Sequence, residues 1–367
     1  MNSGIIALLG SGETAPGMTR VHRELLGRLE PPLGVTIDTS YGFQENVTEM
    51  TIKLVDYFKA SLNLEMKSLS FTSFDTASAL EKELFKQQVR ESNYIFAGPG
   101  SPSYALHQWS RLDLRSDLEA VLSNNGTVIF SSAAALTLGR FAAPIYEIYK
   151  AGADPYWLEG LDLLSSAGLN CVVIPHFDNK EGDGYDTSCC YLGIKRLELL
   201  ESQLPDGTAT LGIDEHTAVI IDLQESTIKV LGRASAHWRI NGTELLLENE
   251  SVTPLSQLVG FTPPTQARES TTQSSALSSP QELAEAVAAG TSDSGGYLAK
   301  LVLMAQTGGE GFIDPAPIVE GILNARVKAR KSGNFELADE LRDILTVAGI
   351  EINDGASGSS WTITKID

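Results

Sequence analysis

The stretch GTVIFSSAAALTLG (residues 126–139) joins an apolar, β-branched run to a segment of small residues. GTVIF is typical of a strand that is covered on both faces, and AAALTLG of a helix that follows it. Similar apolar runs recur along the first half of the chain, separated by amphipathic helical patterns: GIIALLG, GVTIDTS, NYIFAGPG and NCVVIPH. Strand–helix alternation at this spacing predicts an α/β fold with a doubly wound, mostly parallel sheet.

The pattern changes after about residue 205, where short alternating runs are joined by tight turns such as Asn241-Gly242. These runs predict antiparallel strands that extend one edge of the sheet. We therefore expect one domain over residues 1–262. The Ser/Thr/Gln/Pro-rich residues 263–280 have the composition of a flexible linker. Residues 281–367 then predict a helical hairpin domain, with an N-cap and N1 proline at Asp314-Pro315 and a short tail that contains Trp361.

Composition limits the function classes. The chain has 367 residues, 42% of them hydrophobic, and a formal net charge of −20. Such a charge disfavours general nucleic-acid binding. The apolar runs are too short to span a bilayer, and the N-terminus reads as a first strand rather than a secretory signal. The three cysteines, Cys171, Cys189 and Cys190, lack metal-ligand spacing, and a reducing cytoplasm fits them best. We expect no metal and no cofactor.

Ser132 stands where the predicted strand turns into the predicted helix. A nucleophile elbow presents its serine at such a turn, with small residues two positions before and after it. Here Phe130 and Ala134 occupy those positions. The alternative is a plain strand-to-helix turn in which Ser132 is the N-cap. Ser132 fits the elbow better than Ser131, because small residues follow it at the elbow positions.

Other loops at strand ends are candidate ligand contacts, because ligands of open α/β sheets bind there. In GSGETAP (10–16), Gly12 and Glu13 form either a ligand contact or a structural turn. In DTSYGFQEN (38–46), Tyr41 and Gln44 form part of a substrate pocket or of a helix cap. In FAGPGSPSYAL (96–106), the backbone N–H groups of Gly98-Pro99-Gly100 could stabilise an oxyanion, and Ser101 is a possible substrate contact.

His176 ends one apolar strand, and Glu215 lies between two strand-like runs. A serine, a histidine and an acid at successive strand ends suit general-base activation of a hydroxyl. His216 is a competing histidine at the surface. The remaining histidines fall within helix or strand patterns and are interpreted as structural: His22, His107 and His237.

Residues 3–250 resemble the cyanophycinase and aspartyl dipeptidase family, the serine-peptidase branch of the class I glutamine-amidotransferase-like fold. The matching stretches are GPGSPSYAL, SSAAAL, IPHF and GIDEHTA, in the family's order. The resemblance implies that Ser132 is the nucleophile, His176 the base and Glu215 the orienting acid. It also implies an oxyanion hole made by Gly100 and the Ala133 amide. The chain departs from the family at Phe130, at Ala134 and in Gly98-Pro99-Gly100.

The segment ARVKARKSGNFELADELRDILTVAGIEINDGASGSSW (325–361) resembles the terminal domain of cysteinyl-tRNA synthetases, which helps to recognise the tRNA anticodon. Basic residues that could meet RNA phosphates are Arg326, Lys328, Arg330 and Lys331. Acidic residues on the same hairpin could instead pair with them and leave it as a packing or protein-binding element. No synthetase ATP-binding signature occurs.

The sequence thus predicts a serine hydrolase that cleaves a small peptide or amide bond. The alternative is an amidotransferase-like binding protein whose catalysis is weakened by Phe130 and Ala134. In that case the serine would lie too far from His176 for a hydrogen bond. A third hypothesis links the hydrolase to tRNA or to a protein partner through the C-terminal hairpin.

Overall fold

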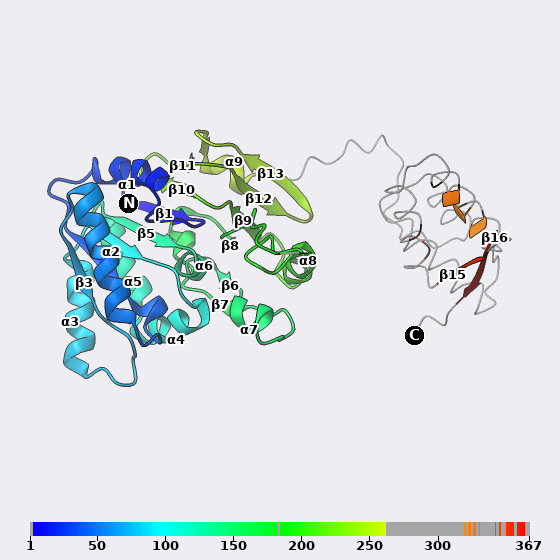
Figure 1. Cartoon of the computed structure of the whole chain (residues 1–367). Coiled ribbons are helices and arrows are strands. Elements are labelled where there is room, and N and C mark those ends of the chain that lie inside the picture. Colours follow the sequence, from blue (N-terminus) through cyan, green and yellow to red (C-terminus); the bar gives the residue numbers. More distant parts are fainter. Residues whose placement is uncertain are drawn as a thin grey trace. The chain divides into compact units, whose positions relative to one another are not determined.

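The computed structural model describes residues 3–182 and 184–261, together with part of the C-terminal region. The described C-terminal residues are 319, 320, 322, 323, 326, 327, 330, 342, 345, 350–355 and 358–363. The chain divides into two compact units, residues 1–267 and 268–367, each of which is treated by itself (Figure 1). The expected linker 263–280 lies outside the described residues.

The first unit is built on an eight-stranded mixed sheet with the order β14-β11-β10-β1-β5-β4-β2-β3. The five strands β1, β5, β4, β2 and β3 are parallel to one another. β10, β11 and β14 continue the sheet beyond β1 as antiparallel strands. Their bounds are β1 (Ile5–Leu9), β2 (Gly34–Ile37), β3 (Met66–Leu69), β4 (Tyr94–Ala97), β5 (Thr127–Ser131), β10 (Thr217–Asp222), β11 (Thr227–Gly232) and β14 (Val252–Pro254). The predicted α/β architecture is therefore observed.

Helices cover both faces of this sheet, which is why its central strands are apolar along their whole length. Alternate residues of β1 enter two different cores. Ile6 and Leu8 pack with residues of α3 (Ala79–Arg90), α4 (Pro102–Leu112) and α5 (Leu114–Ser123). Ile5, Ala7 and Leu9 pack with residues of α1 (Thr19–Leu26) and α2 (Val47–Leu62).

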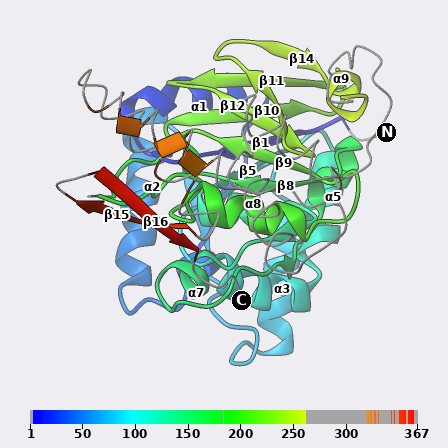
Figure 2. The ribbon, with the colours of Figure 1, turned by 90° about the vertical axis from the view of Figure 1, so that its right-hand side faces the viewer.

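A second sheet of four strands, in the order β13-β12-β9-β8, corrects one expectation. Figure 2 labels β12, β9 and β8 of this sheet. The apolar run at 171–174 was expected in the parallel sheet, and all later strands at its edge. Instead β8 (Cys171–Ile174) pairs in parallel with β9 (Ala209–Ile213). β12 (Ala236–Ile240) and β13 (Thr243–Leu247) then continue this sheet antiparallel. The turn 214–216 carries the chain from β9 in this second sheet to β10 in the first.

The remaining elements of this unit are short. They are the helices α6 (Ala133–Thr137), α7 (Ile145–Tyr149), α8 (Ile194–Ser202) and α9 (Leu255–Val259), the strand pair β6 (Phe141–Ala142) and β7 (Leu158–Glu159), and 3-10 turns at Pro16–Met18, Thr39–Tyr41 and Leu163–Ala167. No helix among the described residues is both long and apolar enough to cross a membrane.

In the second unit, the described residues between 319 and 345 are helical. The rest of the predicted helical hairpin lies outside the described residues. The tail differs from expectation, because β15 (Ile350–Gly355) and β16 (Gly358–Ile363) form an antiparallel hairpin in which Ile352 faces Trp361.

Candidate active site

Ser132 occupies the turn between β5 and α6 in a strained backbone conformation. Its φ is 51° and its ψ −120°, a region that non-glycine residues rarely adopt. Its N–H donates to the carbonyl of Leu9 on the neighbouring strand (2.9 Å). The side chain makes no capping hydrogen bond to α6, so Ser132 is not a conventional N-cap. Strain of this kind costs about 1–3 kcal/mol and is concentrated at functional sites.

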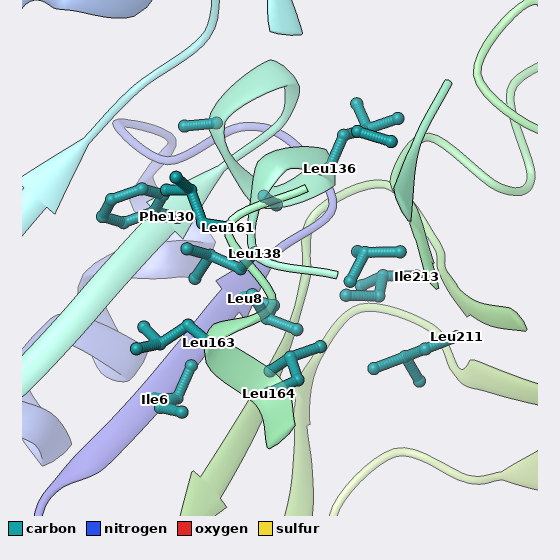
Figure 3. Packing of buried hydrophobic residues seen from close by; sticks show 14 of the residues in the cluster. Ile6, Leu8, Phe130, Leu136, Leu138, Leu161, Leu163, Leu164, Leu211 and Ile213 are labelled. Carbon is teal, nitrogen blue, oxygen red and sulfur yellow. The ribbon is translucent and has the colours of Figure 1, made fainter. Parts of the chain in front are cut away.

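The two unusual elbow positions are accommodated by burial in the core. Phe130 is fully buried, and its ring lies 5.4 Å from that of Trp109. The core cluster that contains Phe130 also includes Leu138 and Leu161 (Figure 3). Ala134 is likewise fully buried. The Phe130 side chain is thus part of the core, and the turn after it has a positive φ at Ser132.

His176 follows β8 and connects the serine to the acid. Its Nε2 lies 2.9 Å from Ser132 Oγ, and its Nδ1 lies 2.8 Å from Glu215 Oε1. A carboxylate only accepts hydrogen bonds, so the proton of the neutral ring is on Nδ1. Nε2 is then free to accept the Ser132 hydroxyl proton.

Glu215 lies in the turn that links β9 to β10, and several groups fix its position. Its Oε1 also accepts a hydrogen bond from Asn179 Nδ2 (3.0 Å), and its N–H donates to Asp178 Oδ1 (2.7 Å). Burial by itself would raise the pKa of Glu215. The hydrogen bonds from His176 and Asn179 outweigh it and place the pKa below its usual value. Glu215 is therefore ionised at neutral pH.

Two backbone N–H groups, those of Gly100 and Ala133, belong to residues that line the cavity beside Ser132 and His176. No protein acceptor for either amide is found in the described part of the chain. Gly100 has a φ of 151°, and a Cβ there would lie 2.0 Å from the Ser40 carbonyl oxygen. Only glycine fits this close approach of the two loops.

The cavity in front of Ser132 has a volume of about 390 Å³. Its lining is largely aromatic and aliphatic and includes one ammonium group: Pro102, Leu136, Ile145, Tyr146, Tyr149, Lys150, Cys190 and Tyr191. One wall carries further strain, because Cys189, Cys190 and Tyr191 have consecutive positive φ values of 55°, 60° and 66°. The Cys190 N–H donates to the His176 carbonyl, which ties this wall to the histidine.

Burial favours the protonated form of the two cysteines near the site, Cys189 and Cys190. Burial raises the pKa of Cys189 to about 11 and that of Cys190 well above its usual value. Both thiols are therefore protonated at neutral pH, and a thiolate is the form that attacks a carbonyl.

The structure places the other predicted contact residues in different locations. Gln44 and Ser101 line an adjoining hollow that shares Tyr146 and Lys150 with the main cavity. Glu13 and Tyr41 line a separate pocket.

Several of these residues have structural partners. Gly12 lies against the ring of His216, and Glu13 Oε2 accepts a hydrogen bond from Ser131 Oγ (3.0 Å). Ser101 Oγ caps α4 at the Tyr104 N–H. His22 is a buried structural residue, as predicted, and burial lowers its pKa to about 4.

Sequence reasoning missed Asn179 and the tyrosines of the cavity. Asn179 follows His176 by three residues in IPHFDN, and that spacing is the signal that could have identified it. Tyr146, Tyr149 and Tyr191 come from segments without a motif.

The basic residues of the second unit are only partly described. Arg326 is buried, with 4% of its surface exposed, so its guanidinium is not presented to a phosphate. Arg330 is exposed, and Lys328 and Lys331 lie outside the described residues.

Comparison with solved structures finds a similar fold over much of this chain. A peptidase from an acI-B1 Actinobacterium superposes with a TM-score of 0.57 at 22% identity, over 69% of this chain and 97% of that one. At this identity the likeness shows a shared fold. A putative peptidase E protein from Listeria monocytogenes EGD-e superposes with a TM-score of 0.44 at 15% identity, over 63% of this chain and all of the other.

Curated relatives match only a short segment. A cysteine–tRNA ligase from Bifidobacterium longum is 56% identical over 41 residues, which is 11% of this chain and 8% of the ligase. The ligase from Pseudomonas paraeruginosa is 40% identical over 58 residues, which is 16% of this chain and 12% of the ligase. This chain therefore covers about a tenth of the length of these relatives. No family model matches the chain.

Proposed function

We propose that the first unit is a serine-type hydrolase that cleaves a small peptide or amide bond. The observation that carries this proposal is the continuous hydrogen-bonded series from Ser132 Oγ through His176 to Glu215, with distances of 2.9 and 2.8 Å, at the wall of a cavity. The peptidase fold of the superposable structure adds support.

In the proposed reaction, Ser132 Oγ attacks the substrate carbonyl carbon while its proton passes to His176 Nε2. Negative charge develops on the carbonyl oxygen, where the Gly100 and Ala133 N–H groups would donate hydrogen bonds. His176 then gives the proton to the leaving amine, and the acyl-enzyme forms. Water, deprotonated by the same imidazole, releases the acid and restores Ser132.

The alternative of a binding protein with weakened catalysis requires a serine out of reach of His176. The 2.9 Å separation favours the hydrolase instead. The burial of Phe130 and Ala134 removes the steric reason for a relaxed elbow.

Reaction with a biotinylated fluorophosphonate tests the proposal, because such probes phosphonylate activated serines. We expect the wild type to be labelled on the peptide that contains Ser132, and Ser132→Ala to remain unlabelled. Ser131→Ala is the matched control, since Ser131 Oγ bonds Glu13 and does not contact His176, and it should still be labelled. A folded wild type that does not react would contradict the proposal.

We also propose that the segment similar to cysteine–tRNA ligases brings the protein to tRNA. The observation in favour is 56% identity over 41 residues with a ligase whose name states that substrate.

Filter binding of tRNA across a salt series tests this second proposal. Replacing Lys328, Arg330 and Lys331 together by alanine should weaken retention and reduce the salt dependence by about three units of slope. Replacing three exposed basic residues of the first unit, Arg20, Lys53 and Lys59, should leave retention unchanged. No retention of the wild type at low salt would exclude the proposal.

A further inference from the structure

We propose that His237 is a positioning residue for this site: its imidazolium, held between Asp214 and Glu244 and stacked on Phe177, fixes the residues next to Glu215 and His176. The inference rests on the proposed function, because the arrangement matters only if His176 and Glu215 act on Ser132. His237 lies on β12, in a strand pattern that gave no sign of such a role.

Both ring nitrogens of His237 meet carboxylate oxygens. Nε2 lies 3.1 Å from Asp214 Oδ1, and Nδ1 lies 2.9 Å from Glu244 Oε1. Carboxylates only accept hydrogen bonds, so satisfying both contacts requires an N–H on each nitrogen. The geometry therefore selects the charged form of the ring. A neutral ring would leave one nitrogen lone pair facing a carboxylate.

The face of the His237 ring packs against Phe177, the residue after His176. Phe177 stacks on His237 with ring centroids 4.6 Å apart and an interplanar angle of 32°. Gly212 is the β9 partner of His237, and a Cβ on it would lie 2.5 Å from the Phe177 ring. The glycine thus leaves the space in which Phe177 lies. The Phe177 N–H also donates to the Ile213 carbonyl (3.0 Å), so the backbone that follows His176 is bound to β9.

The edge of the His237 ring holds Asp214, the residue before Glu215. Asp214 is 6% exposed and directly precedes Glu215. Its Oδ1 accepts from His237, and its Oδ2 accepts from the Ser235 N–H (3.1 Å). One imidazolium therefore contacts both Phe177 and Asp214, the sequence neighbours of His176 and Glu215. Loosening it should move both ends of the 2.8 Å contact between these two residues.

The charged groups around His237 come from four elements. Asp214 lies on the turn between β9 and β10, and Glu244 lies on β13. Arg239 of β12 bonds the other oxygen of Glu244 and also pairs with Glu201 of α8. Partial burial alone would lower the pKa of His237, but the hydrogen bonds to Asp214 and Glu244 outweigh it and raise the pKa above its usual value.

Because the pKa of His237 is raised in the folded protein, the stabilisation that its charged ring provides depends on pH. The stabilisation is complete below the pKa of an unfolded histidine, about 6.5, and is lost as the pH rises through the higher folded-state pKa. The reactivity of Ser132 should therefore fall as the pH rises above about 6.5 and His237 loses its proton.

The first test replaces His237 by phenylalanine, which can still stack on Phe177 but has no N–H to offer Asp214 or Glu244. We expect the second-order rate constant of fluorophosphonate labelling at neutral pH to fall about a hundredfold, the effect of displacing a catalytic group by about 1 Å. His107→Gln is the control, because His107 is an exposed histidine on α4, and it should leave the rate unchanged. An unchanged rate in His237→Phe would overturn the proposal.

The second test keeps His237 and replaces Glu244 by glutamine, at the side of the ring away from Asp214. Loss of this carboxylate lowers the His237 pKa, so the fall in labelling rate with rising pH should begin at lower pH. Glu244 is partly exposed, and folding should tolerate the change. A purely structural role for His237 would not shift this fall, and a fall that stays in place would overturn the proposal.

A third readout separates this inference from the proposed function. The His176 Nδ1–H bonded to Glu215 should give a strongly deshielded proton resonance in the wild type, which His237→Phe should abolish. A wild type that is not labelled at all would defeat the proposed function. The proton signal would still decide the positioning role, and its persistence in His237→Phe would refute that role.

Discussion

Replacing His176 by alanine should lower the rate at which Ser132 reacts with a fluorophosphonate by about 10⁴-fold, the upper end for a general base. The Ser132 hydroxyl donates to His176 Nε2 at 2.9 Å, and no second histidine bonds it among the described residues. Without this acceptor the serine keeps its proton and becomes a poor nucleophile. The measurement is the second-order labelling constant at neutral pH.

His216→Ala is the informative companion variant. His216 lies one residue after Glu215, and its ring lies against Gly12 instead of Ser132. Its loss should reduce labelling far less than the loss of His176. If the two variants ranked in the opposite order, the assignment of the base would be wrong.

The sequence predicted the parallel strands of the sheet and the strand-to-helix turn at Ser132, because both depend on local patterns. The run TVIF forms β5 together with Ser131, and Ser132, which follows the strand, has a positive φ. Whether Phe130 was compatible with an elbow could not be decided locally. That depends on the core around the Phe130 ring, which includes Trp109 of α4.

The second sheet could not be predicted, because its strands look like those of the first. β8 is a continuous buried run, as β1 and β5 are, and its partner β9 lies more than thirty residues later. Pairing between distant strands depends on the turn at 214–216. Nothing in the composition of that turn specifies a change of sheet.

The same limit explains why His237 was interpreted as an ordinary strand residue. Its two carboxylate partners come from β13 and from the turn after β9, and its stacking partner follows β8. Each partner is unremarkable in its own segment. Only the cross-strand pairing of His237 with Gly212 brings them together.

Replacing Glu215 by alanine should lower the labelling rate by about 10⁴-fold, the size of the effect measured when the triad acid of a serine protease is removed. The His176 Nδ1–H and the Asn179 amide would both lose their acceptor, and the imidazole would be free to rotate or to change tautomer. Glu215→Gln should be milder. Oε1 of Glu215 accepts the hydrogen bonds from both His176 and Asn179. A glutamine with its amide oxygen at that position keeps both hydrogen bonds, so the substitution removes only the charge.

The labelling rate should therefore be lowest in Glu215→Ala, intermediate in Glu215→Gln and highest in the wild type. Labelling kinetics check this order, and unfolding at several pH values gives a second measurement. Because the pKa of Glu215 lies below its usual value, the ionised side chain stabilises the wild type above about pH 4.3, and this contribution is lost as the pH falls through the lowered pKa. Glu215→Gln should lack that acid-dependent loss, whereas the exposed control Glu91→Gln should retain it. Equal rates for the glutamine and alanine variants would assign the effect of Glu215 to its charge alone. Wild-type rates in both would exclude it from the site.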